Sequence, residues 1–230
     1  DDIFHLVVRN ALVYTLVSEV FKLALGLLIA HLLVRTFRLR GVVRALLLLP
    51  WIVPTVLSAL AWSWIYDPTF GVLNWSLKHF GLVAEPPNWR FASPWPMISL
   101  IIVNVWRGTP FFALSFLGAM QGIPAELYEA AQLDGAGAWK RLLHVTLPML
   151  RPVALTVTLL TTIVTFADFQ LVHILTGGGP ANQTQVFSTY AYQVGLAGGD
   201  IRRGAAVFLS MFPILSALAF SVLLLIRRDK

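Results

Sequence analysis

The sequence predicts an all-α protein, a polytopic bundle of helices in a membrane. Hydrophobic residues make up 57% of its 230 residues and charged residues only 12%, with a mean hydropathy of +0.75. Soluble domains carry about 25% charged residues, so this composition argues against a water-soluble fold. A helix needs roughly 20 apolar residues to cross a bilayer. Five stretches meet this requirement and predict one transmembrane domain over residues 1–230: 11–34, 42–66, 95–117, 153–175 and 205–226.

The placement of the positive charges predicts which loops face the cytoplasm. With the polar loop 118–148 placed inside, the inside segments contain ten Lys and Arg residues and the outside segments contain five. This difference agrees with the positive-inside rule, so loops 67–94 and 176–203 are predicted to lie outside. The formal net charge of +6 is then a topology signal, and no nucleic-acid partner is expected. The inside charges include Arg35, Arg228 and Lys230.

The first predicted span contains two opposite charges near its middle, Glu19 and Lys22. Residues three apart lie on the same face of a helix. Each charge at this depth costs at least about 2.5 kcal/mol, so both side chains should face protein or water. We therefore expect a self-neutralising ion pair that fixes helix packing. Gly26 should allow another helix to approach closely.

The second predicted span contains Pro50 and Pro54. Proline has no backbone N–H and clashes with the preceding turn of a helix. The two prolines therefore predict a kink or a break halfway through the membrane.

The third and fourth predicted spans each carry a stripe of residues at the helical spacing i, i+3, i+4, i+7. An unpaired guanidinium is excluded from lipid, so the arginine of the third span must face the bundle interior or a cavity. This arginine either forms an ion pair with the aspartate of the fourth span or contacts a ligand, and both roles are compatible. The stripes are Asn104, Arg107, Gly108 and Phe111 in the third span and Thr161, Val164, Thr165 and Asp168 in the fourth.

The inside loop predicts two short helices in water. A proline at the first turn and a run of good helix formers predict a helix over 125–133, which Gly135 stops. A second helix is predicted over 138–147, where Pro148 and then Pro152 should break it.

This loop resembles the cytoplasmic signature of the inner-membrane permeases of binding-protein-dependent ABC importers. The signature residues here are Glu129-Ala130-Ala131, then Gly135, then Val145-Thr146-Leu147-Pro148, with Val145 in place of the usual isoleucine. The resemblance implies the type I ABC importer permease fold, the prokaryotic cytoplasmic (inner) membrane, and one further N-terminal span missing from this chain. It also implies a coupling helix that docks into an ATPase through Glu129, Ala130, Ala131, Gly135, Leu147 and Pro148.

Two further segments resemble the first permease of a maltose-type pair. These are the run from Asn104 to Phe111 and the glycine-rich turn that ends in Gly178-Gly179-Pro180. The resemblance implies that a di- or oligosaccharide is transported and that its contacts are Asn104, Arg107, Gly108, Phe111, Thr161, Val164, Thr165 and Gln170. It implies four kinds of partner: a second permease, two cytoplasmic ATPases that carry ATP and Mg, an external solute-binding protein, and the lipid bilayer.

Two other functions have some support in the sequence. Arg107 departs from the apolar residue usual in maltose-type relatives, and a guanidinium suits an anion, so sn-glycerol 3-phosphate or a related anionic polyol is an alternative substrate. An ion-coupled secondary carrier is a second alternative, in which Glu19, Arg107 or Asp168 would titrate.

An enzyme is not expected. The chain has no cysteine, its five histidines are scattered, and it contains neither a His-Glu-x-x-His nor a Gly-x-Ser-x-Gly motif. We therefore predict no catalytic residue, no metal site and no cofactor in this chain. No Gly-Lys-Ser/Thr follows the glycine-rich turn, which assigns ATP hydrolysis to another polypeptide.

Overall fold

The computed structural model describes residues 2–34 and 37–227, and these residues form helices and loops without a strand. Four of the helices are long and apolar enough to cross a membrane, and a bent helix pair brings the number to as many as five. This result confirms the all-α, multi-span fold class. The predicted inside charges Arg35, Arg228 and Lys230 lie outside the described residues.

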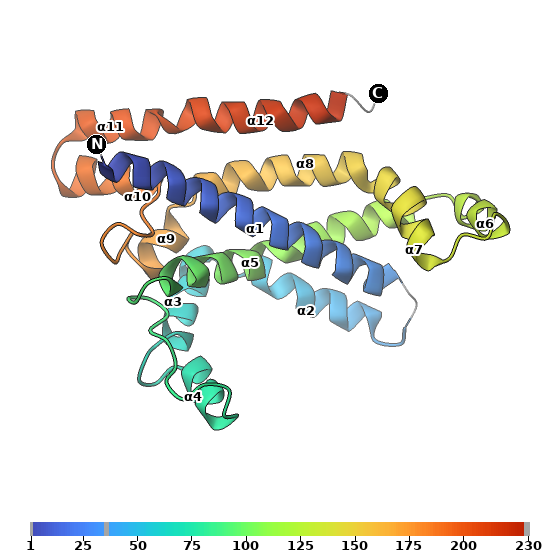
Figure 1. Cartoon of the computed structure of the whole chain (residues 1–230), viewed down its shortest axis with the longest axis horizontal. Coiled ribbons are helices and arrows are strands. Elements are labelled where there is room, and N and C mark those ends of the chain that lie inside the picture. The colour runs from blue at the N-terminus through green and yellow to red at the C-terminus, as the bar shows by residue number, and fades with distance from the viewer. Residues whose placement is uncertain (1, 35–36, 228–230) are drawn as a thin grey trace.

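The centre of the bundle is the contact between α1 (Asp2–Val34) and α5 (Trp95–Gln121), which cross in Figure 1. A Cβ atom built on Gly26 of α1 would lie 2.4 Å from Cβ of Phe112 in α5. The two helices can therefore approach this closely only with glycine at position 26, which confirms its predicted packing role. The first helix also begins earlier than the predicted span 11–34.

The second predicted span is broken. It consists of α2 (Arg40–Ile52) and α3 (Thr55–Ile65), which meet at an angle of 95°. Pro50 lies in the last turn of α2, and Pro54, which has no N–H, separates the two helices in an extended conformation. The predicted break is confirmed.

The inside loop is joined to the bundle without a break. The first short helix, α6 (Ala125–Leu133), has the predicted bounds, and Gly135 ends it with φ +75°. The predicted break at Pro148 is wrong, because α7 (Ala138–Arg141), the π-helix η1 (Leu142–Thr146) and α8 (Leu147–Phe166) form one continuous run. Pro148 directly follows the π-helix η1, and a local adjustment of this kind lets a helix continue past a proline. The second proline, at 152, also stays inside the helix.

The fourth predicted span, 153–175, is wrong in its outer half. Helix α8 ends at Phe166, and a separate helix, α9 (Gln170–Leu175), follows. The reason is local: Asp168 Oδ1 accepts a hydrogen bond from the backbone N–H of Leu171 at 3.2 Å, so this carboxylate caps a new helix.

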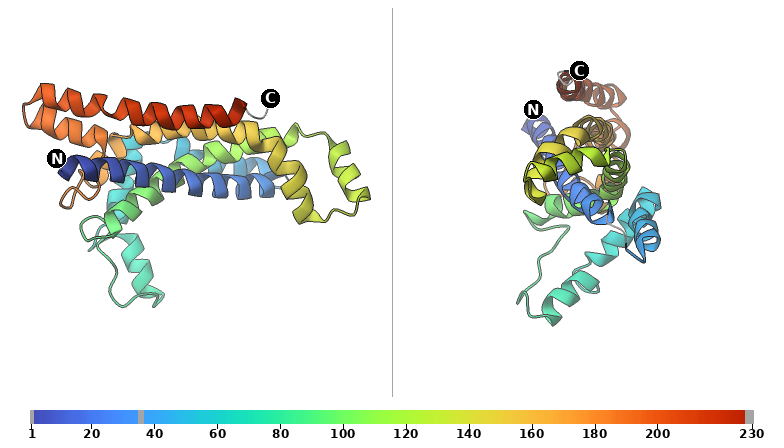
Figure 2. Two further views of the ribbon diagram at one scale, coloured as in Figure 1. Left: turned by 45° about the horizontal axis from the view of Figure 1, so that its top comes forward. Right: turned by 90° about the vertical axis from the view of Figure 1, so that its right-hand side faces the viewer.

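The segments predicted as outside loops contain helices. Loop 67–94 holds α4 (Val72–His79), which extends away from the bundle (Figure 2). Loop 176–203 holds α10 (Phe187–Tyr192) and the π-helix η2 (Gln193–Ala197), and Phe187 is fully buried in the core. The chain then returns along α8 through α11 (Ile201–Leu209) and α12 (Met211–Arg227). In Figure 1, α6 and α7 lie at one end of the molecule and α4, α9 and α10 lie toward the other.

Candidate functional site

A cavity of about 250 Å³ opens where α5 and α8 face each other. One wall is the predicted stripe of α5, and another is formed by Thr161, Val164 and Thr165 of the predicted fourth-span stripe; its last member, Asp168, lies beyond the end of α8 and does not line the cavity. Seven of the eight predicted contact residues line this cavity, and three others join them from α1, α2 and α8. The lining residues are Lys22, Trp51, Asn104, Arg107, Gly108, Phe111, Leu160, Thr161, Val164 and Thr165.

The eighth predicted contact, Gln170, does not reach the cavity. It is the first residue of α9 and is exposed. The break between α8 and α9 turns the chain away from the line of the α8 stripe, so a residue five positions beyond Thr165 no longer continues that stripe.

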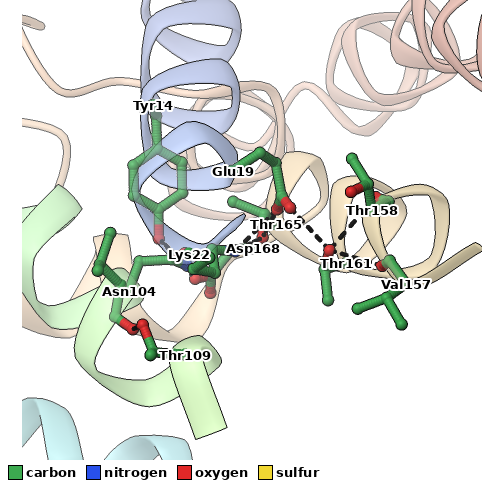
Figure 3. A network of polar contacts seen from close by, with 11 residues as sticks. Tyr14, Glu19, Lys22, Asn104, Thr109, Val157, Thr158, Thr161, Thr165 and Asp168 are labelled. Atoms are coloured by element: carbon green, nitrogen blue, oxygen red, sulfur yellow. Dashed lines mark hydrogen bonds and ion pairs between the residues drawn. The ribbon is translucent and has the colours of Figure 1, made fainter. Parts of the chain in front are cut away.

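The predicted ion pair of α1 lies against the cavity. Lys22 Nζ is 2.8 Å from Glu19 Oε1, and both side chains are almost completely buried. Two hydroxyls of the α8 stripe complete the network (Figure 3): Thr161 donates to Glu19 Oε2 at 2.7 Å, and Lys22 donates to Thr165 Oγ1 at 2.9 Å. The pair is thus neutralised and also connects α1 with α8.

Gly108 contributes space. A Cβ atom built at this position would lie 2.5 Å from Cδ of Lys22. The absence of a side chain on α5 therefore lets the stem of Lys22 pass across the helix and bring its ammonium group to the ion pair and the cavity.

A second hydrogen-bonded chain joins α5 and α1 to the segment between α8 and α9. The amide of Asn104 donates to the hydroxyl of Tyr14 at 2.8 Å, and this hydroxyl donates to Asp168 Oδ2 at 2.8 Å (Figure 3). Among the described residues, Asn104 Oδ1 is buried without a hydrogen-bond partner. This cavity-lining residue therefore has one polar atom without a partner in the described part of the chain.

The ion pair between Arg107 and Asp168 is not formed in the described part of the chain. Arg107 Nη2 instead donates to Thr55 Oγ1 at 2.7 Å, and its Nε atom is buried there without a partner. Asp168 is already engaged by Tyr14 and by the amide that begins α9. Arg107 thus connects α5 to the broken span.

The predicted coupling residues lie at the end of the molecule formed by α6 and α7. Glu129, Ala130, Gly135 and Pro148 are exposed, whereas Ala131 and Leu147 are half-buried. A contact between Tyr128 and Thr146, with the two hydroxyl oxygens 3.0 Å apart, joins α6 to η1. The tip of α6 presents Leu133, whose side chain is 90% exposed.

Comparison with known families identifies the chain. Residues 22–228 match the family of the binding-protein-dependent transport system inner membrane component. The chain belongs to this family. The permease is therefore an inner membrane component of an ABC transporter, which confirms the resemblance carried by the inside loop.

Named relatives cover nearly all of the permease. The trehalose/maltose transport system permease protein MalF of Thermococcus litoralis is 36% identical over 220 residues, which are 94% of this chain and 73% of the relative. The diacetylchitobiose uptake system permease protein DasB of Streptomyces coelicolor is 33% identical, over 100% of this chain and 71% of its own.

Solved transporters share the fold of the permease. A chain of a bacterial ABC transporter that imports the acidic polysaccharide alginate matches with a TM-score of 0.87 and 24% identity, over 99% of this chain and 80% of that one. A chain of the MetNI methionine ABC transporter matches with a TM-score of 0.68 and 20% identity, over 100% and 99%. These likenesses confirm the type I importer fold.

Sequence reasoning did not place Trp51 and Leu160 in the site of the permease, and it gave Lys22 only a packing role. Leu160 precedes the α8 stripe by one residue and carries no polar signal. Trp51 lies in the last turn of α2, where its ring stacks on that of Phe111 with centroids 5.9 Å apart and planes 9° apart. Its position beside Pro50, at a predicted break, was the signal that could have found it.

Proposed function

We propose that the permease moves a di- or oligosaccharide across the inner membrane through the cavity between α5 and α8. The observation that carries this proposal is the composition of the cavity. An aromatic pair, Trp51 and Phe111, forms one part of its wall, and amide, hydroxyl and cationic groups form another.

This composition suits a sugar. A sugar ring has an apolar C–H face, which an aromatic ring can cover, and hydroxyls that both donate and accept hydrogen bonds. The buried acceptor Asn104 Oδ1 and the buried donor Arg107 Nε, which have no partner among the described residues, match such hydroxyls. The reported relatives named for sugars support a carbohydrate over sn-glycerol 3-phosphate. Membership of an ABC transporter family argues against an ion-coupled carrier.

The proposed assembly contains a second permease, two cytoplasmic ATPases that carry ATP and Mg, and an external solute-binding protein. One solved alginate transporter with this fold is described in complex with a saccharide-bound periplasmic protein. We assign docking on the ATPase to Glu129, Ala130, Ala131, Gly135, Leu147 and Pro148. In this assignment the exposed face of α6 occupies a cleft of the ATPase, and the motion of nucleotide-driven closure reaches the cavity through α8.

The test is a variant whose larger side chain fills the cavity and leaves the hydrogen bonds around it in place. Val164 lines the cavity, and its side chain is 72% exposed. In the complete complex, reconstituted in proteoliposomes with its binding protein, Val164→Trp should lower saccharide transport at least ten-fold. Maltose, trehalose, diacetylchitobiose and sn-glycerol 3-phosphate serve as substrates, and ATP hydrolysis without substrate should be unchanged.

Ile163→Phe is the matched control, because Ile163 lies on the same helix turn but does not line the cavity. It should transport at the rate of the unchanged complex. Normal transport by Val164→Trp would overturn the cavity assignment. Transport of sn-glycerol 3-phosphate, with no saccharide moved, would overturn the substrate class.

A further inference from the structure

A long apolar groove lies between α1 and α2, with α5 as its floor. In the described part of the chain both helices pack on α5 but make few contacts with each other, and α2 runs beside α1 in Figure 1. The groove has a volume of about 980 Å³ and is lined almost entirely by hydrocarbon and aromatic side chains. A hydroxyl in the lining, that of Thr109, donates to the backbone oxygen of Val105 in its own helix. The lining therefore suits hydrocarbon rather than a polar ligand.

The groove is about as long as one leaflet of a bilayer is thick. Its lining runs from Val17 to Ile29 on α1 and from Ile98 to Pro110 on α5, which at 1.5 Å per residue is about 18 Å. Half of a hydrocarbon core of about 30 Å is about 15 Å.

The width of the groove separates two kinds of occupant. Spread over its length, the volume corresponds to a channel about 8 Å across, whereas a helix with its side chains is roughly 10–12 Å wide. An acyl chain has no side chains and is about 4 Å thick, which is the contact distance between carbon atoms. The groove is thus too narrow to enclose a helix and has room for acyl chains.

The groove is also open along its side. Phe21 of α1 and Leu46 of α2 line its two walls and are 51% and 58% exposed. A lipid can therefore enter laterally from the membrane. Because its tails leave one hydrocarbon environment for another, they gain packing contacts but little hydrophobic free energy. Preference for one lipid over another must then come from the headgroup.

A positive charge without a counter-ion lies at the end of the groove where α1 stops and α2 begins. Arg44 directly follows the lining residue Val43 and lies one turn before Leu47. In the described part of the chain no carboxylate forms an ion pair with the half-buried Arg44, and its Nε and Nη2 atoms are buried without a hydrogen-bond partner. A phosphate beside this guanidinium would supply both the negative charge and acceptor oxygens.

We propose that the groove binds one anionic phospholipid of the inner leaflet, with its acyl chains between α1 and α2 and its phosphate at Arg44. The predicted orientation places the start of α2 at the cytoplasmic face, where the leaflet carries a negative surface potential. Basic pockets between transmembrane helices on this side bind anionic headgroups through the same chemistry. The lipid then joins α2, the inner half of the broken span, to α1. This proposal is independent of which substrate is transported.

The first experiment tests the headgroup. The complete complex, in a neutral detergent, is titrated with dioleoylphosphatidylglycerol, and bound lipids are counted by native mass spectrometry. One saturable lipid should bind to this permease, and dioleoylphosphatidylcholine should bind more weakly, because its choline group offsets the charge of the phosphate.

Variants of two arginines locate the charge. Arg44→Gln should weaken the binding of phosphatidylglycerol at least about ten-fold, which is the scale of a lost charge-assisted hydrogen bond. Arg44→Lys keeps the charge and should keep most of the binding. Arg38→Gln removes the same charge from an exposed position and is the matched control, which should bind like the unchanged complex.

The second experiment tests the groove apart from the headgroup. Leu46→Trp fills the groove and should weaken the binding of phosphatidylglycerol. Its matched control is Leu49→Trp, on the same helix at a 51% exposed position that does not line the groove, and this variant should bind normally. With p-benzoylphenylalanine in place of Leu46, light should attach phosphatidylglycerol to this chain.

Three results would each overturn the proposal. Equal binding by Arg44→Gln and the unchanged complex would mean that Arg44 does not hold the phosphate. Normal binding by Leu46→Trp would mean that the acyl chains lie elsewhere. Cross-linking of position 46 to another protein chain instead of lipid would mean that a partner helix covers the groove. If Arg44→Gln does not assemble, the Leu46 pair and the cross-link still decide the question.

Discussion

The buried ion pair between Glu19 and Lys22 allows a quantitative test of what holds the three central helices together. The perturbation is Lys22→Met, which keeps most of the side-chain volume and removes the charge. It leaves Glu19 buried beside Thr161 and Thr165 without the ammonium group that now lies 2.8 Å away.

The expected cost follows from the burial of the pair. The side chains of Lys22 and Glu19 are 2% and 5% exposed, so solvent does not screen the charge that remains. Removing one partner of a buried pair costs about 3–5 kcal/mol. For a chain of this size, each kcal/mol shifts the melting temperature by about 2–4 °C, which gives a decrease of about 6–20 °C.

The assay is thermal denaturation of the detergent-solubilised complex at one fixed heating rate, followed by the loss of the monodisperse species. The double variant Glu19→Gln, Lys22→Met removes both charges and keeps an acceptor for Thr161. It should recover most of the loss, because no charge is then left buried without a partner. Lys78→Met, at an exposed position of α4, is the control and should change stability by less than about 0.5 kcal/mol.

Two results would refute this reasoning. The first is a melting temperature of Lys22→Met equal to that of the unchanged complex, which would mean that water enters the site and replaces the lost cation. The second is a double variant no more stable than Lys22→Met. That result would assign the loss to packing or to the missing hydrogen bond of Lys22 to Thr165 rather than to the unpaired charge.

Three further predictions concern single positions. Gly26→Val should lower the melting temperature of the complex, because the new side chain would overpack against Phe112 at a cost of about 1–3 kcal/mol. The control is Gly118→Ala, which should leave the melting temperature unchanged, because a Cβ atom built there has no atom within 4 Å. Gly135→Asp should leave the complex assembled and uncouple ATP hydrolysis from transport, measured together in proteoliposomes; normal coupling would contradict the docking role. Asp67 accepts hydrogen bonds from two backbone amides of its own loop, and these bonds hold the pKa of its carboxyl below the usual value. The contribution of Asp67 to loop stability is therefore present at neutral pH and is lost as the pH falls below about 4. A carbon NMR titration of the Asp67 carboxyl with a midpoint at or above the usual pKa of aspartate would disprove this prediction.

The parts of the fold that depend on local chain chemistry could be predicted from the sequence. Helical spacing placed the stripes of α5 and α8, Pro50 and Pro54 gave the broken span, and the bounds of α6 followed from a proline and Gly135. Each of these signals acts within one or two turns of its own residues, so no knowledge of the tertiary arrangement was needed.

The errors arose where distant residues decide the outcome. Arg107 pairs with Thr55 rather than with Asp168, because Tyr14 from the first helix and the start of α9 occupy that carboxylate. The early end of the fourth span, which removed Gln170 from the cavity, has instead a local cause, the hydrogen bond from the start of α9 to Asp168. Sequence spacing shows which residues share a face of one helix, but not which neighbouring helix that face meets.

The unbroken run of helix from Ala138 to Phe166 has a consequence for how such a transporter could diversify. At 1.5 Å per residue, the 15 residue steps from Thr146, whose hydroxyl contacts α6, to Thr161 at the cavity correspond to about 22 Å along the run. A continuous helix connects the two positions, and at this separation the side chains around one do not contact those around the other. If Thr161 contacts the cargo and α6 docks on an ATPase, as proposed, substitutions around Thr161 would change the cargo without altering the docking surface, and one ATPase would serve several permeases.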